Sequence, residues 1–166
     1  MASACSIASS ATRSSVDGTG VQVDFYHLVA SPLERVLPRI AERVVGGDGR
    51  LVIVAGDERQ RASLDRLLWT YTPDSFLPHA QAGGERDADQ PVLIAPEVVA
   101  SNGARNVALV DGVWRDAALD FDRAFHFFDD DTVGAARTAW KALGGREGVE
   151  RRYWKQDDAG KWTQAA

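Results

Sequence analysis

The residues that could do chemistry are three histidines, an acidic run and one face of a helix near the carboxyl end. His27, His79 and His126 are the three histidines, and each is a candidate base because imidazole titrates near neutrality. None has metal-ligand or nucleophile spacing to another. His79 could face a cleft, but its position between Pro78 and Ala80 favours a loop histidine that is hydrogen-bonded to backbone.

The acidic run Asp129-Asp130-Asp131 precedes the last predicted helix, at 132–143. It could hold a divalent ion, but negative charge at the start of a helix is also favoured by the helix dipole, and we predict this second role. Cys5 is the single cysteine, and the chain has no Cys/His cluster typical of structural zinc. The sequence therefore predicts no metal and no cofactor.

The last predicted helix carries the most informative surface. Four residues three or four positions apart share one of its faces: Val133, Arg137, Trp140 and Lys141. One interpretation is a tryptophan half-buried in the core beside two solvated cations. The other is a docking point for a peptide that ends in an aromatic residue, because Arg137 could bind its free carboxylate and an apolar pocket its ring. Such a peptide is expected to bind with micromolar affinity after its ordering costs.

Strand and helix patterns alternate along the chain. Strands are predicted at 21–29, 51–55, 92–95 and 107–110, and the last three are unbroken apolar runs typical of strands covered on both faces. The order predicts an α/β class, with a Rossmann-like three-layer fold, a mostly parallel twisted sheet and helices on both faces. The segment 151–162 is predicted to add an edge strand.

Two predicted helices begin with capping signals. Ser31 is the predicted N-cap of the first, followed by Pro32 and Glu34, and Asp57 caps the second with Gln60 completing a capping box. Pro38 lies inside the first helix and predicts a kink without a break.

Length and charge restrict the class of protein. The 166 residues predict one domain at 21–166, after an extension at 1–20 that is disordered or an upstream start. No apolar run approaches the roughly 20 residues that span a bilayer, and the single cysteine favours the cytoplasm.

The net charge of −5 argues against strong direct DNA binding, whereas the cations between Arg137 and Lys155 favour an acidic protein partner.

Two alternatives stay open. A small hydrolase or nucleotide-binding enzyme could use His79 with an acidic residue, although the chain has neither a glycine-rich turn after its first strand nor a phosphate-binding loop. A direct single-stranded DNA binder could use Trp140, Tyr153 and Trp154 as stacking platforms, although the net charge counts against it.

From about Val21 to Trp162 the chain resembles the chi subunit of bacterial DNA polymerase III, an accessory of the clamp-loader complex. The matching stretches are VDFYHL, LVIVAGDERQRASLDRLLWTYTPDSFLPHAQAG, PVLIAP and AARTAWKAL. The resemblance implies a non-catalytic binding module that docks the acidic C-terminal tail of single-stranded DNA-binding protein. Arg137 matches the family's key arginine for that tail, and Trp140 and Lys141 match its neighbours. Val133 departs from the pattern, because relatives can carry a lysine there, which implies weaker capture of the acidic stretch.

The resemblance also implies roles for four more aromatic residues. Phe127 or Phe128 should line the tail-binding pocket. Trp69 and Phe76 match aromatics that family members use toward the psi subunit, and in some cases toward a repair helicase at an overlapping surface. Trp69 lies off the apolar stripe of its helix and Phe76 in a loop between prolines, so neither has an automatic place in the core.

Overall fold

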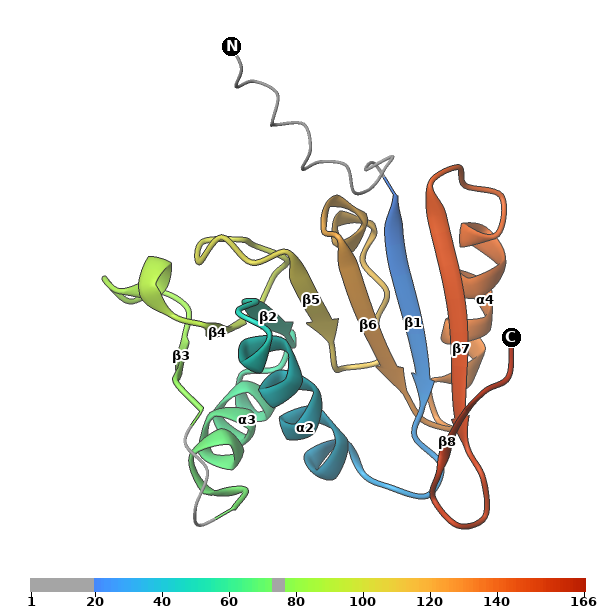
Figure 1. Ribbon diagram of the computed structural model, residues 1–166, viewed down its shortest axis with the longest axis horizontal. Helices are drawn as coiled ribbons and strands as arrows, with labels where there is room; N and C mark the ends of the chain where they lie inside the picture. The colour runs from blue at the N-terminus through green and yellow to red at the C-terminus, as the bar shows by residue number, and fades with distance from the viewer. Residues whose placement is uncertain (1–19, 73–76) are drawn as a thin grey trace.

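The computed structural model describes residues 20–72 and 77–166. Within them one eight-stranded sheet has the order β3-β4-β2-β5-β6-β1-β7-β8 (Figure 1). Every neighbouring pair is parallel except β7 with β8. The strands are β1 (Val21–His27), β2 (Leu51–Val54), β3 (His79–Gln81), β4 (Val92–Ala95), β5 (Asn106–Leu109), β6 (Arg123–Phe128), β7 (Val149–Gln156) and β8 (Trp162–Gln164).

Each face of the sheet carries its own hydrophobic cluster. Helices α2 (Leu33–Gly46) and α3 (Glu58–Thr70) pack on one face, which we call the α2 face. Helix α4 (Val133–Leu143) and the short helix η2 (Asp116–Asp120) pack on the other, the α4 face. A further short helix, η1 (Asp87–Asp89), lies between β3 and β4. The predicted α/β class and mostly parallel sheet are confirmed.

The three apolar runs form strands as predicted. All four residues of β2 and of β4 are fully buried, because both strands lie inside the sheet and side chains on either face meet a packed layer. The expected extension at 1–20 falls outside the described residues except for Gly20.

The prediction of an edge strand at 151–162 is incomplete. This part of the chain contributes to two strands: β7 pairs in parallel with β1, and β8 pairs antiparallel with β7. Strand β7 therefore lies inside the sheet, and only β8 is at its edge. As a result, side chains of β7 alternate between the two faces, with Tyr153 on the α4 face and Trp154 on the α2 face.

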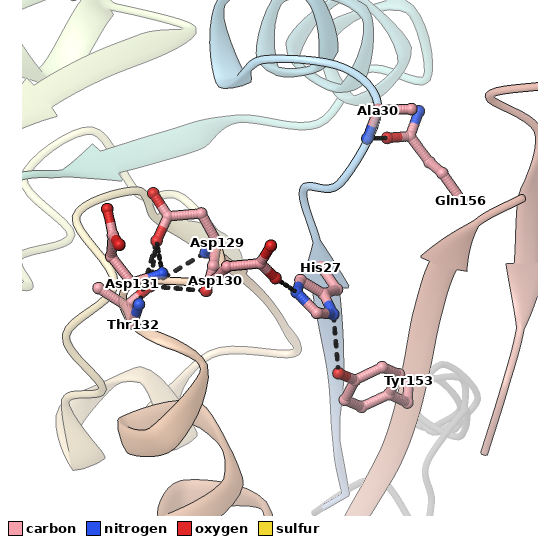
Figure 2. Close-up of polar contacts among 8 residues, drawn as sticks. All are labelled: His27, Ala30, Asp129, Asp130, Asp131, Thr132, Tyr153 and Gln156. Carbon is pink, nitrogen blue, oxygen red and sulfur yellow. Dashed lines mark hydrogen bonds and ion pairs between the residues drawn. The ribbon is translucent and has the colours of Figure 1, made fainter. Parts of the chain in front are cut away.

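The predicted cap at Ser31 is wrong. The N-cap of α2 is Pro32, and no side chain caps the helix. Ser31 Oγ instead accepts a hydrogen bond from Gln156 Nε2 at 3.0 Å. The side-chain oxygen Oε1 of Gln156 in turn accepts from the amide of Ala30 (Figure 2) and from the amide of Ser31, so the end of β7 holds the loop that leads into α2.

The second helix start is predicted correctly in part. The Asp57 side chain accepts from the amide of Arg59 at 3.0 Å and caps α3. Gln60 does not complete a capping box, because its Nε2 donates to the carbonyl of Val110 at 3.1 Å and ties α3 to the end of β5. Pro38 lies inside α2, which continues without a break as predicted.

Candidate functional site

Helix α4 packs one side on the sheet and turns the other outward. Ala136, Ala139 and Leu143 are buried against the α4 face. Arg137 and Lys141 are exposed one turn apart, with Val133 and Trp140 half-buried beside them. Within the described residues neither cation forms an ion pair. The structure therefore brings together the four residues that helical spacing predicts, and leaves two positive charges available on the outer side.

Contacts with three residues hold the Trp140 ring in place on the same helix as those cations. It meets Phe25 and Tyr153 edge to face, with ring centroids 5.2 and 5.7 Å apart. The guanidinium of Arg151 lies 4.1 Å from the centroid of the Trp140 ring, and Arg151 Nη1 donates to the Trp140 carbonyl at 2.6 Å. One face of the indole is therefore occupied by a cation–π contact, while the edge-to-face contacts with Phe25 and Tyr153 fix the orientation of the ring.

Arg151 is a residue that the sequence analysis missed as part of this face. Its placement depends on β7 being inside the sheet, where alternate residues share a face. Gly144, just after α4, makes room for it: a Cβ there would lie 3.0 Å from Arg151 Nη1. The alternation of Arg151 with Tyr153 is the signal that could have revealed it.

Phe127 and Phe128 lie on opposite faces of the sheet. Phe128 belongs to the α4 face, and Phe127 to the α2 face, where its ring stacks 5.2 Å from that of Tyr26. Both are almost completely buried. Of the two, only Phe128 belongs to the hydrophobic cluster against which Val133 and Trp140 pack.

A hydrogen-bonded chain supports the start of α4 (Figure 2). His27 Nε2 lies 2.8 Å from Asp130 Oδ1, and His27 Nδ1 lies 3.2 Å from the Tyr153 hydroxyl. Burial raises the pKa of Tyr153 above its ordinary value of 10.0, and the nearby charge of Arg137 opposes part of that rise. Both nitrogens of His27 have partners, so this histidine positions Tyr153 and, through it, the Trp140 ring.

The acidic run lies at the start of α4, as predicted. Asp129 Oδ1 accepts from the amides of Asp131 and Thr132 at 3.0 and 3.1 Å, and from the Thr132 hydroxyl at 3.0 Å (Figure 2). Thr132 is the residue before the first turn of α4. Among the described residues no group of three or more His, Cys, Asp or Glu side chains could hold a metal ion.

His79 is packed between α3 and β3. It is 6 % exposed, its Nδ1 lies 2.7 Å from the Leu77 carbonyl, and its Nε2 lies 3.0 Å from the Asp65 carbonyl and 3.2 Å from Asp65 Oδ1. The predicted hydrogen bonding of His79 to backbone is confirmed, although the residue begins strand β3 and does not lie in a loop.

The enzyme alternative needs His79 in a pocket at the carboxyl edge of the sheet. A cavity of about 500 Å³ does lie at that edge, between the loops that follow β1, β5 and β6, but His79 does not line it. Its acidic lining residues are Glu34, Asp111 and Asp129. Asp111 is committed to a two-point ion pair with Arg115, and Asp129 holds the turn before α4.

The other predicted surface is seen only at Trp69. This residue of α3 is 54 % exposed, and its ring centroid lies 4.8 Å from that of His79. Phe76 lies outside the described residues. The stacking platform predicted from Trp140, Tyr153 and Trp154 is not formed, because Trp154 lies on the α2 face and the other two lie on the α4 face.

The fold is an α/β module with exposed cations on the outer side of α4 and a buried aromatic layer between this helix and the sheet. The family model described as DNA polymerase III chi subunit, HolC, matches residues 21–150. The chain therefore belongs to the DNA polymerase III chi subunit family. This family consists of non-catalytic accessory subunits of DNA polymerase III.

Three relatives support the assignment. The chain is 30 % identical over 115 residues to DNA polymerase III subunit chi of Escherichia coli (strain K12), covering 68 % of this chain and 78 % of that one. It is 37 % identical over 76 residues to DNA polymerase III subunit chi of Pseudomonas aeruginosa (44 % of this chain, 52 % of the relative). It is 27 % identical over 89 residues to a probable DNA polymerase III subunit chi of Rickettsia prowazekii (54 % of each). The matches span about half the length of the last two relatives. Within the described residues no helix is long and apolar enough to cross a membrane.

Proposed function

We propose that the outer side of α4 docks the acidic C-terminal tail of single-stranded DNA-binding protein, and that the chain thereby links that protein to the polymerase III clamp loader. The observation that carries this proposal is the pair Arg137 and Lys141, exposed and without an ion pair within the described residues, above the fixed ring of Trp140.

The charges around α4 give the tail a direction. The acidic run lies at the amino end of the helix, next to Val133, and repels an acidic peptide there. Arg137 lies near the middle of the helix, one turn away from the acidic run, and Lys141 lies in its last turn. The terminal carboxylate of the tail therefore binds at Arg137, where a charge-assisted hydrogen bond forms, and its aromatic residue packs against the apolar parts of Val133 and Trp140.

Arg137→Ala is expected to weaken binding of the tail about 10- to 100-fold, because the variant lacks the charge-assisted hydrogen bond to the terminal carboxylate. The measurement is a fluorescence titration with an acidic peptide of about nine residues ending in Pro-Phe. Amidation of the peptide's carboxyl terminus should have a similar effect on the wild-type protein.

Arg59→Ala is the matched control, because Arg59 is an exposed helical arginine on the other side of the sheet. It should bind the peptide as the wild type does, and both variants should keep the stability of the wild type within about 0.5 kcal/mol. Equal binding of the free and amidated peptides would contradict carboxylate capture on α4.

We further propose that a psi-type partner, where the organism has one, binds around Trp69, with a repair helicase as a competing partner at an overlapping surface. A half-exposed tryptophan is typical of an interface hot spot. Helix α3 covers the α2 face of the sheet, so this surface is separate from α4.

Trp69→Ala is expected to weaken psi binding about 30-fold, the size of a hot-spot substitution, and to leave tail binding unchanged. Phe76→Ala is predicted to behave in the same way. Isothermal titration calorimetry with purified psi measures the first effect, and the peptide titration the second. Loss of tail binding in Trp69→Ala would show that the two surfaces are wrongly divided.

A further inference from the structure

A groove on the α2 face carries four arginines and no acidic lining residue. It has a volume of about 360 Å³ and lies between α2 and the hairpin of β7 and β8. Helix α2 contributes Arg35, Arg39 and Arg43, and β6 contributes Arg123. The sheet separates this groove from the outer side of α4.

The three arginines of α2 lie in a row that is slightly inclined to the helix axis. They are four residues apart, so each lies about 6 Å along the helix axis from the next. All three are exposed, and none forms an ion pair with a described residue. Like charges at this spacing destabilise a helix, so the row is a feature that the fold alone does not require.

Arg123 differs from the row because it already has a partner. Its Nε and Nη2 donate to Asp24 Oδ2 at 2.8 and 2.7 Å, and its guanidinium carbon lies 4.6 Å from the centroid of the Phe125 ring. Asp24 is fully buried beneath the groove, so its charge is neutralised before it can oppose an anion.

Aromatic rings line the same groove. Trp154 is held in place because its Nε1 donates to Asp24 Oδ1 at 3.1 Å, and its ring lies nearly parallel to that of Tyr26, at 12°. Trp162 stands perpendicular to Tyr26, with centroids 5.2 Å apart. Both tryptophans are half-buried, so part of each indole faces outward beside the arginine row.

We propose that this groove binds a short stretch of single-stranded DNA, with successive phosphates on Arg35, Arg39 and Arg43 and a base against Trp162 or Trp154. A positive groove that follows the backbone, next to aromatic stacking surfaces, is the combination used by proteins that bind single strands. Guanidinium groups also match phosphate geometry. Membership of a DNA polymerase subunit family selects DNA over RNA.

The site lies on the opposite face from the tail-binding surface and does not depend on the function proposed for α4. Because the protein has a net charge of −5, the rest of its surface repels DNA. Contact with DNA is therefore confined to the groove, and the affinity for DNA is expected to be modest. An extended acidic peptide is the competing occupant, because carboxylates would also pair with an arginine row.

The test uses the full chain and a fluorescently labelled dT12, followed by anisotropy at 50 to 200 mM salt. Three phosphate contacts predict a slope of about −2 in log affinity against log salt, so the affinity should fall about 20-fold over that range. The combined variant Arg35→Ala, Arg39→Ala, Arg43→Ala should lose binding at 50 mM salt. A matched variant with the same net charge, Arg59→Ala, Arg66→Ala, Arg86→Ala, should bind as the wild type does.

Two single variants refine the result. Trp162→Ala should lower the affinity by about 5-fold or more, the cost of one lost stacking contact, without changing the salt slope or the secondary structure seen by circular dichroism. Arg137→Ala should bind dT12 normally, so failure of the tail proposal is distinguishable from failure of this one.

Three outcomes would overturn the proposal. The first is no saturable binding of dT12 by the wild type at 50 mM salt. The second is an equal loss in both triple variants, which would reduce the effect to overall charge. The third is displacement of dT12 by an acidic peptide that binds the groove more tightly, which would make the site a peptide groove.

Discussion

Asp24→Ala is expected to lower the free energy of unfolding by about 3 kcal/mol, at the lower end of the range for breaking a buried ion pair. The Asp24 carboxylate is fully buried in β1 and accepts from Arg123, Trp154 and Gln22. Removing it leaves the Trp154 N–H without its acceptor and the Arg123 charge without its counterion. Because the Arg123 side chain is 40 % exposed, water partly hydrates the stranded charge and limits the loss.

Urea denaturation of the wild type and the variant measures this effect. The matched control is Asp122→Ala, which breaks the surface pair of Asp122 with Arg105, where both side chains are more than half exposed. Such a pair is worth about 0 to 1 kcal/mol. If Asp24→Ala costs no more than Asp122→Ala, the buried carboxylate does not join β1, β6 and β7 as inferred.

The second large effect is a loss of stability in weak acid caused by His126. This residue is fully buried, and neither ring nitrogen has a hydrogen-bond partner in the described structure. Burial lowers the pKa of His126 from its ordinary value of 6.5 to about 4. Below pH 6.5 His126 is protonated in the unfolded chain, whereas in the folded chain it stays neutral down to about pH 4. The free energy of unfolding therefore has its full value above pH 6.5 as far as His126 is concerned. It falls by about 3 kcal/mol between pH 6.5 and pH 4.

His126→Phe isolates this contribution. Phenylalanine fits the setting of Phe25, Trp114 and Phe128 rings that surrounds His126, and it has no polar atoms to leave unpaired. The variant should be at least as stable as the wild type at pH 7.5, and its stability should fall less between pH 6.5 and 4 in denaturant titrations. An unchanged pH dependence would show that other groups account for the acid sensitivity.

The parts of the fold that could be predicted depend on local patterns. The apolar runs of β2, β4 and β5 need nothing beyond their own residues to indicate buried strands, and the Asp57 cap is set by its side chain and a neighbouring amide. The outer side of α4 was predictable for the same reason, because helical spacing alone places Arg137 beside Trp140.

The parts that could not be predicted depend on partners far away in the chain. The local sequence predicts that Ser31 caps a helix, but its hydroxyl oxygen accepts a hydrogen bond from the side chain of Gln156, 125 residues further along the chain. Arg151 reaches Trp140 only because β7 lies inside the sheet. Which of Phe127 and Phe128 lies on the α4 face also depends on distant pairing, because a shift of one residue along a strand moves a side chain to the other face.

The position of β1 has a consequence for how the protein is made. Strand β1 pairs with β6 and β7, and its Asp24 is 99 residues from Arg123 and 130 from Trp154. At about 5 to 20 residues per second, a ribosome needs about 5 to 20 s to add the first of those partners after β1 itself. During that interval an apolar strand has both of its edges open, which is the condition in which nascent chains need protection from aggregation. The second edge of β1 can be covered only when β7, which begins at Val149, has also been synthesised.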